Sequence, residues 1–130
     1  MHADFEHRIA ATGLTRLAYA TANSANGLRH AIRGEAAVRQ EAALIAVAAP
    51  AGLAIAPNPG WYVAMLGALL MLLIVELLNT AIEKLADHVT PDWNAKIGVV
   101  KDIASAAVFV AILMAGLIWL MAAALRLEII

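Results

Sequence analysis

Five polar side chains recur at helical spacing within and just beyond a long apolar segment of the sequence. They are Glu76, Asn79, Thr80, Glu83 and Asp87. At about 100° per residue these positions share one narrow face of a helix, while the neighbouring leucines and isoleucines point elsewhere. Carboxylates suit proton transfer, and their oxygens are ligands that Mg²⁺ accepts, usually one or two beside substrate phosphates. The column predicts a reaction between a lipid-dissolved substrate and a water-soluble one that needs a divalent cation.

Glu76 is the carboxylate placed deepest in the apolar segment. Trp61 precedes it by 15 residues, or roughly 22 Å at about 1.5 Å per residue. A hydrocarbon core of about 30 Å would therefore contain Glu76 near one boundary, with Glu83 at that boundary. A carboxylate in lipid costs about 2.5–3.5 kcal/mol on insertion scales and usually serves function. The alternative is a neutral acid that hydrogen-bonds a neighbouring helix and only holds the helices together.

Composition supports a membrane setting. Of the 130 residues, 63% are apolar and 15% charged, whereas a soluble domain is about half apolar and a quarter charged. The net charge of −1 gives no signature of nucleic-acid binding. The absence of cysteine excludes a disulfide framework, thiolate catalysis and a cysteine-based zinc site.

Three apolar blocks are long enough, with their flanks, to cross a bilayer. The predicted transmembrane segments cover about residues 36–56, 61–86 and 101–125. The turn "PNPG" separates the first two, and a polar linker containing Pro91 separates the last two. We therefore expect an all-α membrane protein with one domain over residues 1–130.

Residues 1–34 have a different pattern, in which apolar positions alternate with arginines. They predict one or two amphipathic helices on the membrane surface, interrupted at Gly13 and Gly27. The alternative is a frayed polar tail.

Basic residues indicate the orientation in the membrane. Five arginines lie at or before the start of the first segment, and Lys84, Lys96 and Lys101 lie in or beside the second linker. The "PNPG" turn has no basic residue. The positive-inside rule then predicts a cytoplasmic N-terminus and second linker.

Two further clusters lie at the predicted cytoplasmic boundary. Glu35, Arg39 and Glu41 surround the start of the first segment, and Lys101 and Asp102 begin the third. The simpler interpretations are a Glu35–Arg39 ion pair on a helix surface and a Lys101 that snorkels to the interface. No Walker A loop, kinase glycine-rich loop or "HRD" motif is present. A phosphoryl-transfer enzyme with this sequence would belong to an unrelated class.

Three stretches carry a resemblance to a known family: "GLRHAIRGEAAVRQEAAL", "VELLNTAIEKLAD" and "AKIGVVKDIASAAV". Over about residues 13 to 125 the chain resembles the small integral-membrane diacylglycerol kinases of bacteria. The resemblance implies three transmembrane helices with an N-terminal surface helix, a homotrimer with shared sites, and a location in the bacterial cytoplasmic (inner) membrane. It also implies Mg²⁺-dependent transfer of the ATP γ-phosphate to diacylglycerol, which gives phosphatidate.

The same resemblance assigns roles to individual residues. Glu76 would be the general base on the lipid hydroxyl, Asn79 would orient Glu76 or the phosphoryl group, and Ser105 would lie by the lipid. Glu35 and Glu83 would hold the metal ion. The nucleotide-binding residues would be Arg16, Glu35, Glu83, Lys101 and Asp102. The alternatives are an undecaprenol kinase of the same family and a non-enzymatic small membrane oligomer.

Overall fold

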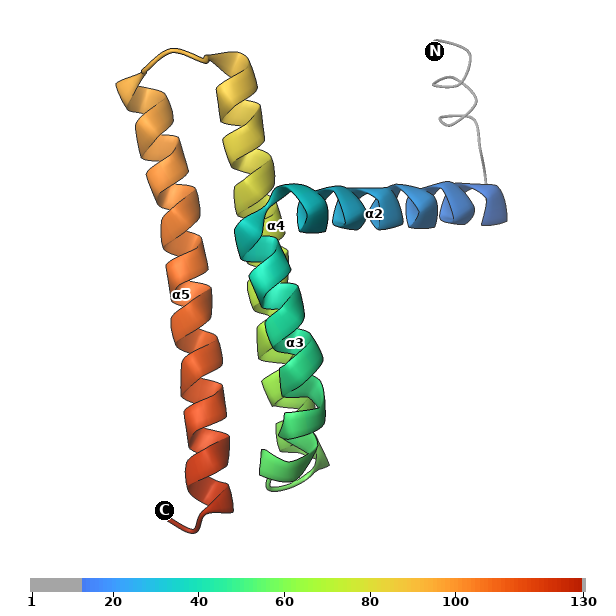
Figure 1. Cartoon of the computed structure of the whole chain (residues 1–130), viewed down its shortest axis with the longest axis vertical. Helices are drawn as coiled ribbons and strands as arrows, with labels where there is room; N and C mark the ends of the chain where they lie inside the picture. The colour runs from blue at the N-terminus through green and yellow to red at the C-terminus, as the bar shows by residue number, and fades with distance from the viewer. Residues whose placement is uncertain (1–12, 130) are drawn as a thin grey trace.

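The computed structural model describes residues 13–129, in which all regular structure is helical (Figure 1). The helices are α2 (Leu14–Gly34), α3 (Ala36–Ile55), α4 (Pro59–Val89) and α5 (Ala95–Arg126). Three of them, α3, α4 and α5, are long and apolar enough to cross a membrane. The predicted all-α class with three such helices is therefore confirmed. Residues 1–12 of the predicted surface-helix region lie outside the described residues.

Asparagine caps begin the two longest helices. The Asn58 side chain accepts a hydrogen bond from the Trp61 backbone N–H at 3.1 Å, and Pro59 occupies the first turn. The Asn94 side chain accepts from the N–H groups of Lys96 and Ile97 at 3.0 and 3.3 Å. These caps satisfy N–H groups that a helix start leaves without a partner.

Helix α2 runs without a break through Gly27. The predicted interruption at Gly27 is wrong, because one glycine in a helix costs only about 1 kcal/mol relative to alanine and the flanking residues continue the helix. Gly13 does mark a boundary: it precedes α2 with φ of 60°, a conformation that glycine adopts readily.

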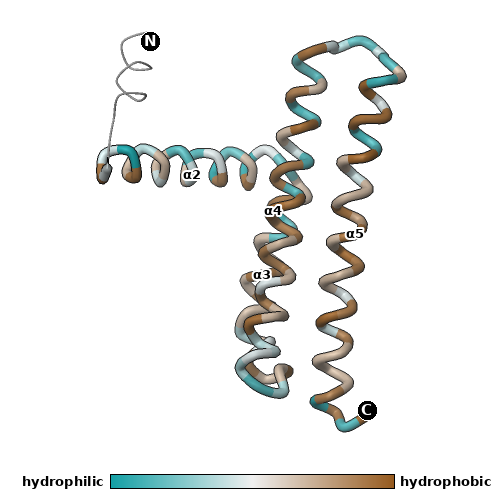
Figure 2. Tube along the Cα trace, turned by 180° about the vertical axis from the view of Figure 1, so that it is seen from behind, coloured by the Kyte–Doolittle hydropathy of each residue, from teal (hydrophilic) through white to brown (hydrophobic). Residues whose placement is uncertain are grey.

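Helix α4 lies between α3 and α5 and contacts both, while α2 projects sideways from the three-helix unit (Figures 1 and 2). A single residue, Glu35, joins α2 to α3 in an extended conformation with φ −114° and ψ 123°. One extended residue between two helices produces a sharp corner without a loop. We call Glu35 and the two helix ends beside it the α2–α3 corner.

Small side chains let the three long helices approach one another. Ala48, Ala68, Leu69 and Ala115 form the buried cluster of the unit, as expected where van der Waals packing rather than water exclusion drives helix association. Trp119 packs against this cluster, and its Nε1–H donates to the Met65 carbonyl at 3.1 Å. This bond ties α5 to α4.

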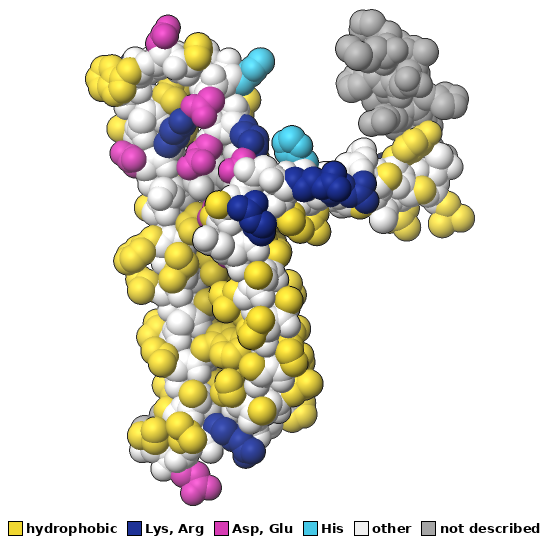
Figure 3. Space-filling model, viewed as in Figure 1, with side chains coloured by type: hydrophobic (Ala, Val, Ile, Leu, Met, Phe, Trp, Pro, Cys, Tyr) yellow, Lys and Arg dark blue, Asp and Glu magenta, His cyan; other side chains and the backbone are white. Residues whose placement is uncertain are grey.

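Charged side chains gather at one end of the three-helix unit. Figure 3 shows acidic and basic groups around the α4–α5 linker and the α2–α3 corner, and an almost wholly hydrophobic surface along the rest of that face. A smaller charged group marks the opposite end. The fold therefore has a charged end and an apolar body.

Candidate active site

The buried polar side chains of residues 13–129 are three members of the predicted column on α4. Glu76, Asn79 and Thr80 are 7%, 8% and 8% exposed. Glu83 is half-buried one turn further along, and Asp87 is exposed. The column therefore passes from a buried carboxylate to an exposed one within three helical turns.

Glutamates from three places in the chain lie near this column. The negative charges of Glu83 and Glu35 act on Glu76, and the charge of Glu76 acts on Glu41 of α3. Glu35 reaches the column because the α2–α3 corner packs beside the upper part of α4 (Figure 1). We call Glu35, Glu41, Glu76 and Glu83 the glutamate cluster.

Asn79 forms a hydrogen bond with the next carboxylate of the column, Glu83, one helical turn further along α4. Its Nδ2 donates to Glu83 Oε1 at 3.3 Å. The Asn79 Oδ1 is buried and accepts no hydrogen bond. The Glu41 Oε2 is likewise buried and accepts no hydrogen bond. A buried oxygen without a donor is destabilising unless a ligand or water supplies one, so both oxygens are available to a bound ligand.

Two lysines pair with carboxylates at the charged end. Lys84 Nζ lies 2.6 Å from Glu35 Oε1, and Lys101 Nζ lies 2.5 Å from Asp87 Oδ1. Glu35 thus pairs with Lys84 of α4, and the ion pair with Arg39 that its spacing suggested is not formed. Lys101 joins α5 to the last residue of the α4 column.

Four of the predicted site residues are not brought to the glutamate cluster within this chain, and one of them, Lys101, pairs with Asp87 instead. Asp102 and Ser105 are exposed on α5 and their side chains make no hydrogen bond to any residue in 13–129. Arg16 is exposed on α2, about five helical turns or roughly 28 Å from Glu35 along that helix. A complete site with all predicted members would need a second chain or a movement of α2.

The donors of the glutamate cluster fit a hard divalent cation. Among residues 13–129, no three His, Cys, Asp or Glu side chains converge into a complete metal site. Mg²⁺ does not require one, because it is usually held by one or two carboxylates together with substrate phosphates and water. Glu35 and Glu83 offer such carboxylates, and the unpaired Oδ1 of Asn79 is a further oxygen of the right kind.

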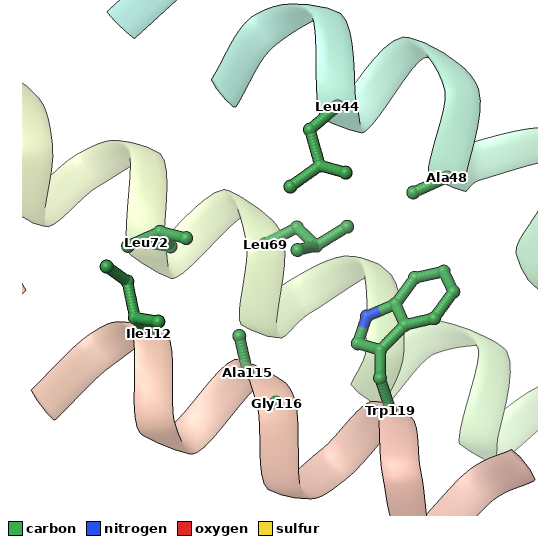
Figure 4. A pocket seen from close by; sticks show the side chains of 8 residues that line it. All are labelled: Leu44, Ala48, Leu69, Leu72, Ile112, Ala115, Gly116 and Trp119. Carbon is green, nitrogen blue, oxygen red and sulfur yellow. The ribbon is translucent and has the colours of Figure 1, made fainter. Parts of the chain in front are cut away.

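An apolar cavity of about 280 Å³ lies between α3, α4 and α5 (Figure 4). Its lining consists of Leu44, Ala48, Leu69, Leu72, Ile112, Ala115, Gly116 and Trp119. On α4, Leu72 and Leu69 precede Glu76 by one and about two turns on the same helical face. The cavity therefore begins just below the buried carboxylate, on the side away from the charged end.

The sequence alone did not assign a role in the site to Lys84 or Trp119, and it placed Glu41 with Glu35 and Arg39 in a cluster at the cytoplasmic boundary. Glu41 had a local signal, because an acid that begins an apolar run needs a partner. Lys84 and Trp119 had none, since each makes its contact with a distant segment: Lys84 with Glu35 and Trp119 with Met65.

Comparison with known proteins gives a consistent answer. Residues 22–123 match the family model described as prokaryotic diacylglycerol kinase. The chain is 40% identical over 108 residues to a diacylglycerol kinase of Pseudomonas aeruginosa, 35% to one of Escherichia coli and 32% to one of Haemophilus influenzae. These alignments cover 83% of this chain and 88%, 88% and 92% of the respective relatives. With a family model that matches most of its length, this chain belongs to the prokaryotic diacylglycerol kinase family.

Proposed function

We propose that this protein transfers the γ-phosphoryl group of ATP to the hydroxyl of diacylglycerol, at the charged end of its three long helices. One observation carries the proposal: Glu76 is buried on a membrane-type helix, with Glu35 and Glu83 towards the charged end and an all-apolar cavity towards the other end. A water-soluble phosphate donor suits the first side and a lipid alcohol suits the second. The names of the relatives, each a diacylglycerol kinase, agree with this chemistry.

Glu76 acts as the general base in this proposal. Its carboxylate accepts the proton of the lipid hydroxyl as the hydroxyl oxygen attacks the γ-phosphorus, and ADP departs. Asn79 would act through Glu83, since its amide N–H donates to that carboxylate. Its free Oδ1 faces the same buried region.

Glu35 and Glu83 would hold Mg²⁺, which would supply positive charge that offsets the charge of the nucleotide phosphates. Lys101 and Asp102 would contact the nucleotide from α5. Phosphoryl transfer depends mainly on positioning and charge neutralisation, so a few polar side chains on three helices are a sufficient set.

The apolar cavity would receive an acyl chain of the lipid. Every residue that lines it is hydrophobic or glycine, and it begins about one turn below Glu76. A lipid whose hydroxyl reaches Glu76 would extend its chain in this direction. Ser105 would meet the ester region of the lipid from a neighbouring chain.

A homotrimer with shared sites completes the proposal. Asp102 and Ser105 face outward from the single chain, and Arg16 lies far along α2. A buried carboxylate in a membrane also needs protein around it on all sides. The three long helices of one chain are too few to surround it. A neighbouring chain would bring these residues to the glutamate cluster.

The decisive experiment measures ATP consumption by the purified protein in mixed micelles with diacylglycerol, with undecaprenol and with no added lipid. We expect phosphatidate formation that requires diacylglycerol and Mg²⁺. A tenfold or greater preference for undecaprenol would assign the polyprenol alcohol as substrate. No lipid-dependent consumption would favour a non-enzymatic membrane oligomer.

The proposed location is the bacterial inner membrane, with the N-terminus and the α4–α5 linker in the cytoplasm. Since the chain contains no cysteine, single cysteines can be labelled in intact cells with an impermeant maleimide. We expect Leu127→Cys to react from outside and Asp92→Cys to react only after permeabilisation; both positions are exposed, and neither side chain caps a helix, since Leu127 ends α5 through its backbone N–H alone. The reverse pattern would invert the topology. These positions are preferable to Asn58 and Asn94, whose side chains cap helices.

A further inference from the structure

Lys84 forms an ion pair with one member of the glutamate cluster, Glu35. Its ammonium lies 2.6 Å from Glu35 Oε1. The other ion pair within residues 13–129, between Lys101 and Asp87, lies outside the cluster. Four carboxylates gathered at one place repel one another, so Lys84 reduces the electrostatic cost of holding the cluster together.

The position of Lys84 lets it change partners. Its side chain is 51% exposed and that of Glu35 is 30% exposed. A lysine carries its charge on a flexible four-carbon stem with three rotatable donors. Lys84 also lines a groove of about 590 Å³ between α2 and α4, so the ammonium has open space beside it.

Lys84 directly follows Glu83 on α4 and reaches across to Glu35. In the proposed function it is therefore paired with one of the carboxylates that would hold the metal ion and is the sequence neighbour of the other. The nucleotide phosphates would come to the same place. An ammonium is a strong point-charge ligand for phosphate, and the Glu35 oxygen that it occupies is one that a divalent cation would use.

We propose that Lys84 is a nucleotide-binding residue of this chain that exchanges partners, leaving Glu35 for the triphosphate when the metal nucleotide binds. The proposal rests on the proposed function, because it needs a metal nucleotide at Glu35 and Glu83. Before binding, Lys84 competes with a divalent cation for Glu35. After binding, it contacts a phosphate oxygen.

Partner exchange predicts two effects of opposite sign for Lys84→Met, which removes the charge and keeps most of the stem. Mn²⁺ without nucleotide should bind more tightly, by about two- to fivefold, the range for the loss of a part-exposed charge pair. A non-hydrolysable ATP analogue with Mg²⁺ should bind about tenfold more weakly, because a charge-assisted hydrogen bond to phosphate is lost.

Two titrations of the full-length protein in detergent micelles measure these effects. Free Mn²⁺ is followed by electron paramagnetic resonance, and the analogue by equilibrium binding. Lys84→Arg keeps the charge and should stay near wild type in both titrations. Lys96→Met is the matched control: Lys96 is exposed on α5 outside the cluster, so its loss should change neither titration.

Any other outcome of the two titrations would contradict the proposal. Weaker binding of both ligands by Lys84→Met would make Lys84 a residue that only positions the α2–α3 corner. No change in either would make the pair with Glu35 an ordinary surface ion pair. If the wild-type protein itself bound no nucleotide and consumed no ATP with lipid, the proposed function would fail first and the partner exchange with it.

Discussion

The two halves of α4 bury side chains in different ways. In the first half, Met65, Ala68, Leu69 and Leu72 are buried. Ala68 and Leu69 belong to the cluster with Ala48 and Ala115, against which Trp119 packs. In the second half, Glu76, Asn79 and Thr80 are buried to a similar degree, but two buried oxygens around them accept no hydrogen bond. The apolar half of α4 therefore contributes to the stability of the fold. The polar half has unsatisfied groups that can bind a ligand.

The two halves of α4 also differ in whether their contacts are made within one chain. The apolar half finds its partners within one chain, including the Trp119 hydrogen bond to Met65. The polar half does not, since Asp102 and Ser105 face outward beside it. In the proposed function the first half is therefore a scaffold, and the second half is part of a site that ligands and a neighbouring chain would complete.

Glu76→Gln should give the largest effect on activity. Glutamine keeps the size and the hydrogen-bonding ability of the side chain but cannot act as the base at neutral pH. We expect kcat for diacylglycerol to fall by at least about 10²-fold, the lower end for loss of a general base, with little change in the apparent affinity for ATP. Steady-state kinetics in mixed micelles measures both constants.

Met65→Ala provides the matched control in the apolar half of α4. Met65 is fully buried and does not line the cavity, and a buried methionine-to-alanine change costs about 2–5 kcal/mol in soluble cores. Met65→Ala should lower the thermal midpoint and leave kcat near wild type at low temperature. Glu76→Gln should instead lower kcat and leave the thermal midpoint near wild type. If Glu76→Gln kept near-normal turnover, Glu76 would be a structural acid and the division of α4 would be wrong.

Mixing of inactive subunits tests whether the polar half is completed by another chain. Glu76→Gln and Asp102→Asn proteins, each of low activity, are unfolded to exchange subunits and reassembled at equal amounts. If each site takes Glu76 from one chain and Asp102 from its neighbour in a cyclic oligomer, random mixing makes about one quarter of the sites complete. We therefore expect about a quarter of wild-type activity.

Glu76→Gln mixed with Glu83→Gln is the control for this experiment. Both residues lie on α4 of one chain, so no mixed site would regain both and activity should stay low. Recovery in the control, or its absence in the test pair despite demonstrated subunit exchange, would contradict a site shared through Asp102.

Sequence patterns predicted the division of α4 but not its partners. Helical spacing alone placed Glu76, Asn79 and Thr80 on one face, because a continuous helix has a fixed period, and all three share the buried face in the structure. Apolar run lengths likewise predicted three long helices, which the structure contains.

Contacts between distant segments carried no such signal. Glu35 had a nearby candidate partner in Arg39, yet it pairs with Lys84, 49 positions further along the chain. The deciding feature is the extended backbone of Glu35 at the α2–α3 corner, and a single extended residue between helices leaves no compositional mark. Gly27 shows the opposite error: its local preference for a break is overridden by the helix on both sides.

A substitution in the apolar cavity, beside the first half of α4, should have an effect of intermediate size on activity. Gly116 lines the cavity, and an added Cβ at that position meets no atom within 4 Å. Gly116→Leu should therefore fill the space without a clash and favour the helix. We expect kcat/KM for a long-chain diacylglycerol to fall about tenfold, a normal penalty for lost room in an apolar pocket, with no loss of thermal stability.

Gly67→Leu is the matched control for the cavity. Gly67 is on α4, also has open space around its Cβ position and does not line the cavity. It should leave kcat/KM unchanged. Equal effects of the two substitutions would mean that leucine acts through helix packing in general, and an unchanged kcat/KM in Gly116→Leu would show that no acyl chain enters the cavity.

The smallest expected effect concerns the Lys101–Asp87 pair, which joins α4 to α5 at the charged end. Lys101 Nζ and Asp87 Oδ1 are 2.5 Å apart, but the side chains are 35% and 65% exposed. Exposed ion pairs contribute only about 0.2–1 kcal/mol, because water and salt screen them. A double-mutant cycle of Lys101→Met and Asp87→Asn, measured by thermal unfolding in detergent, should give a coupling energy in that range that shrinks as salt is added. The effect on ATP binding should be asymmetric: Lys101→Met loses a nucleotide contact, whereas Asp87→Asn frees Lys101 from a competing partner. A coupling energy above about 2 kcal/mol would make this pair part of the scaffold, and the boundary between the stabilising and the chemical halves of α4 would then move beyond Asp87.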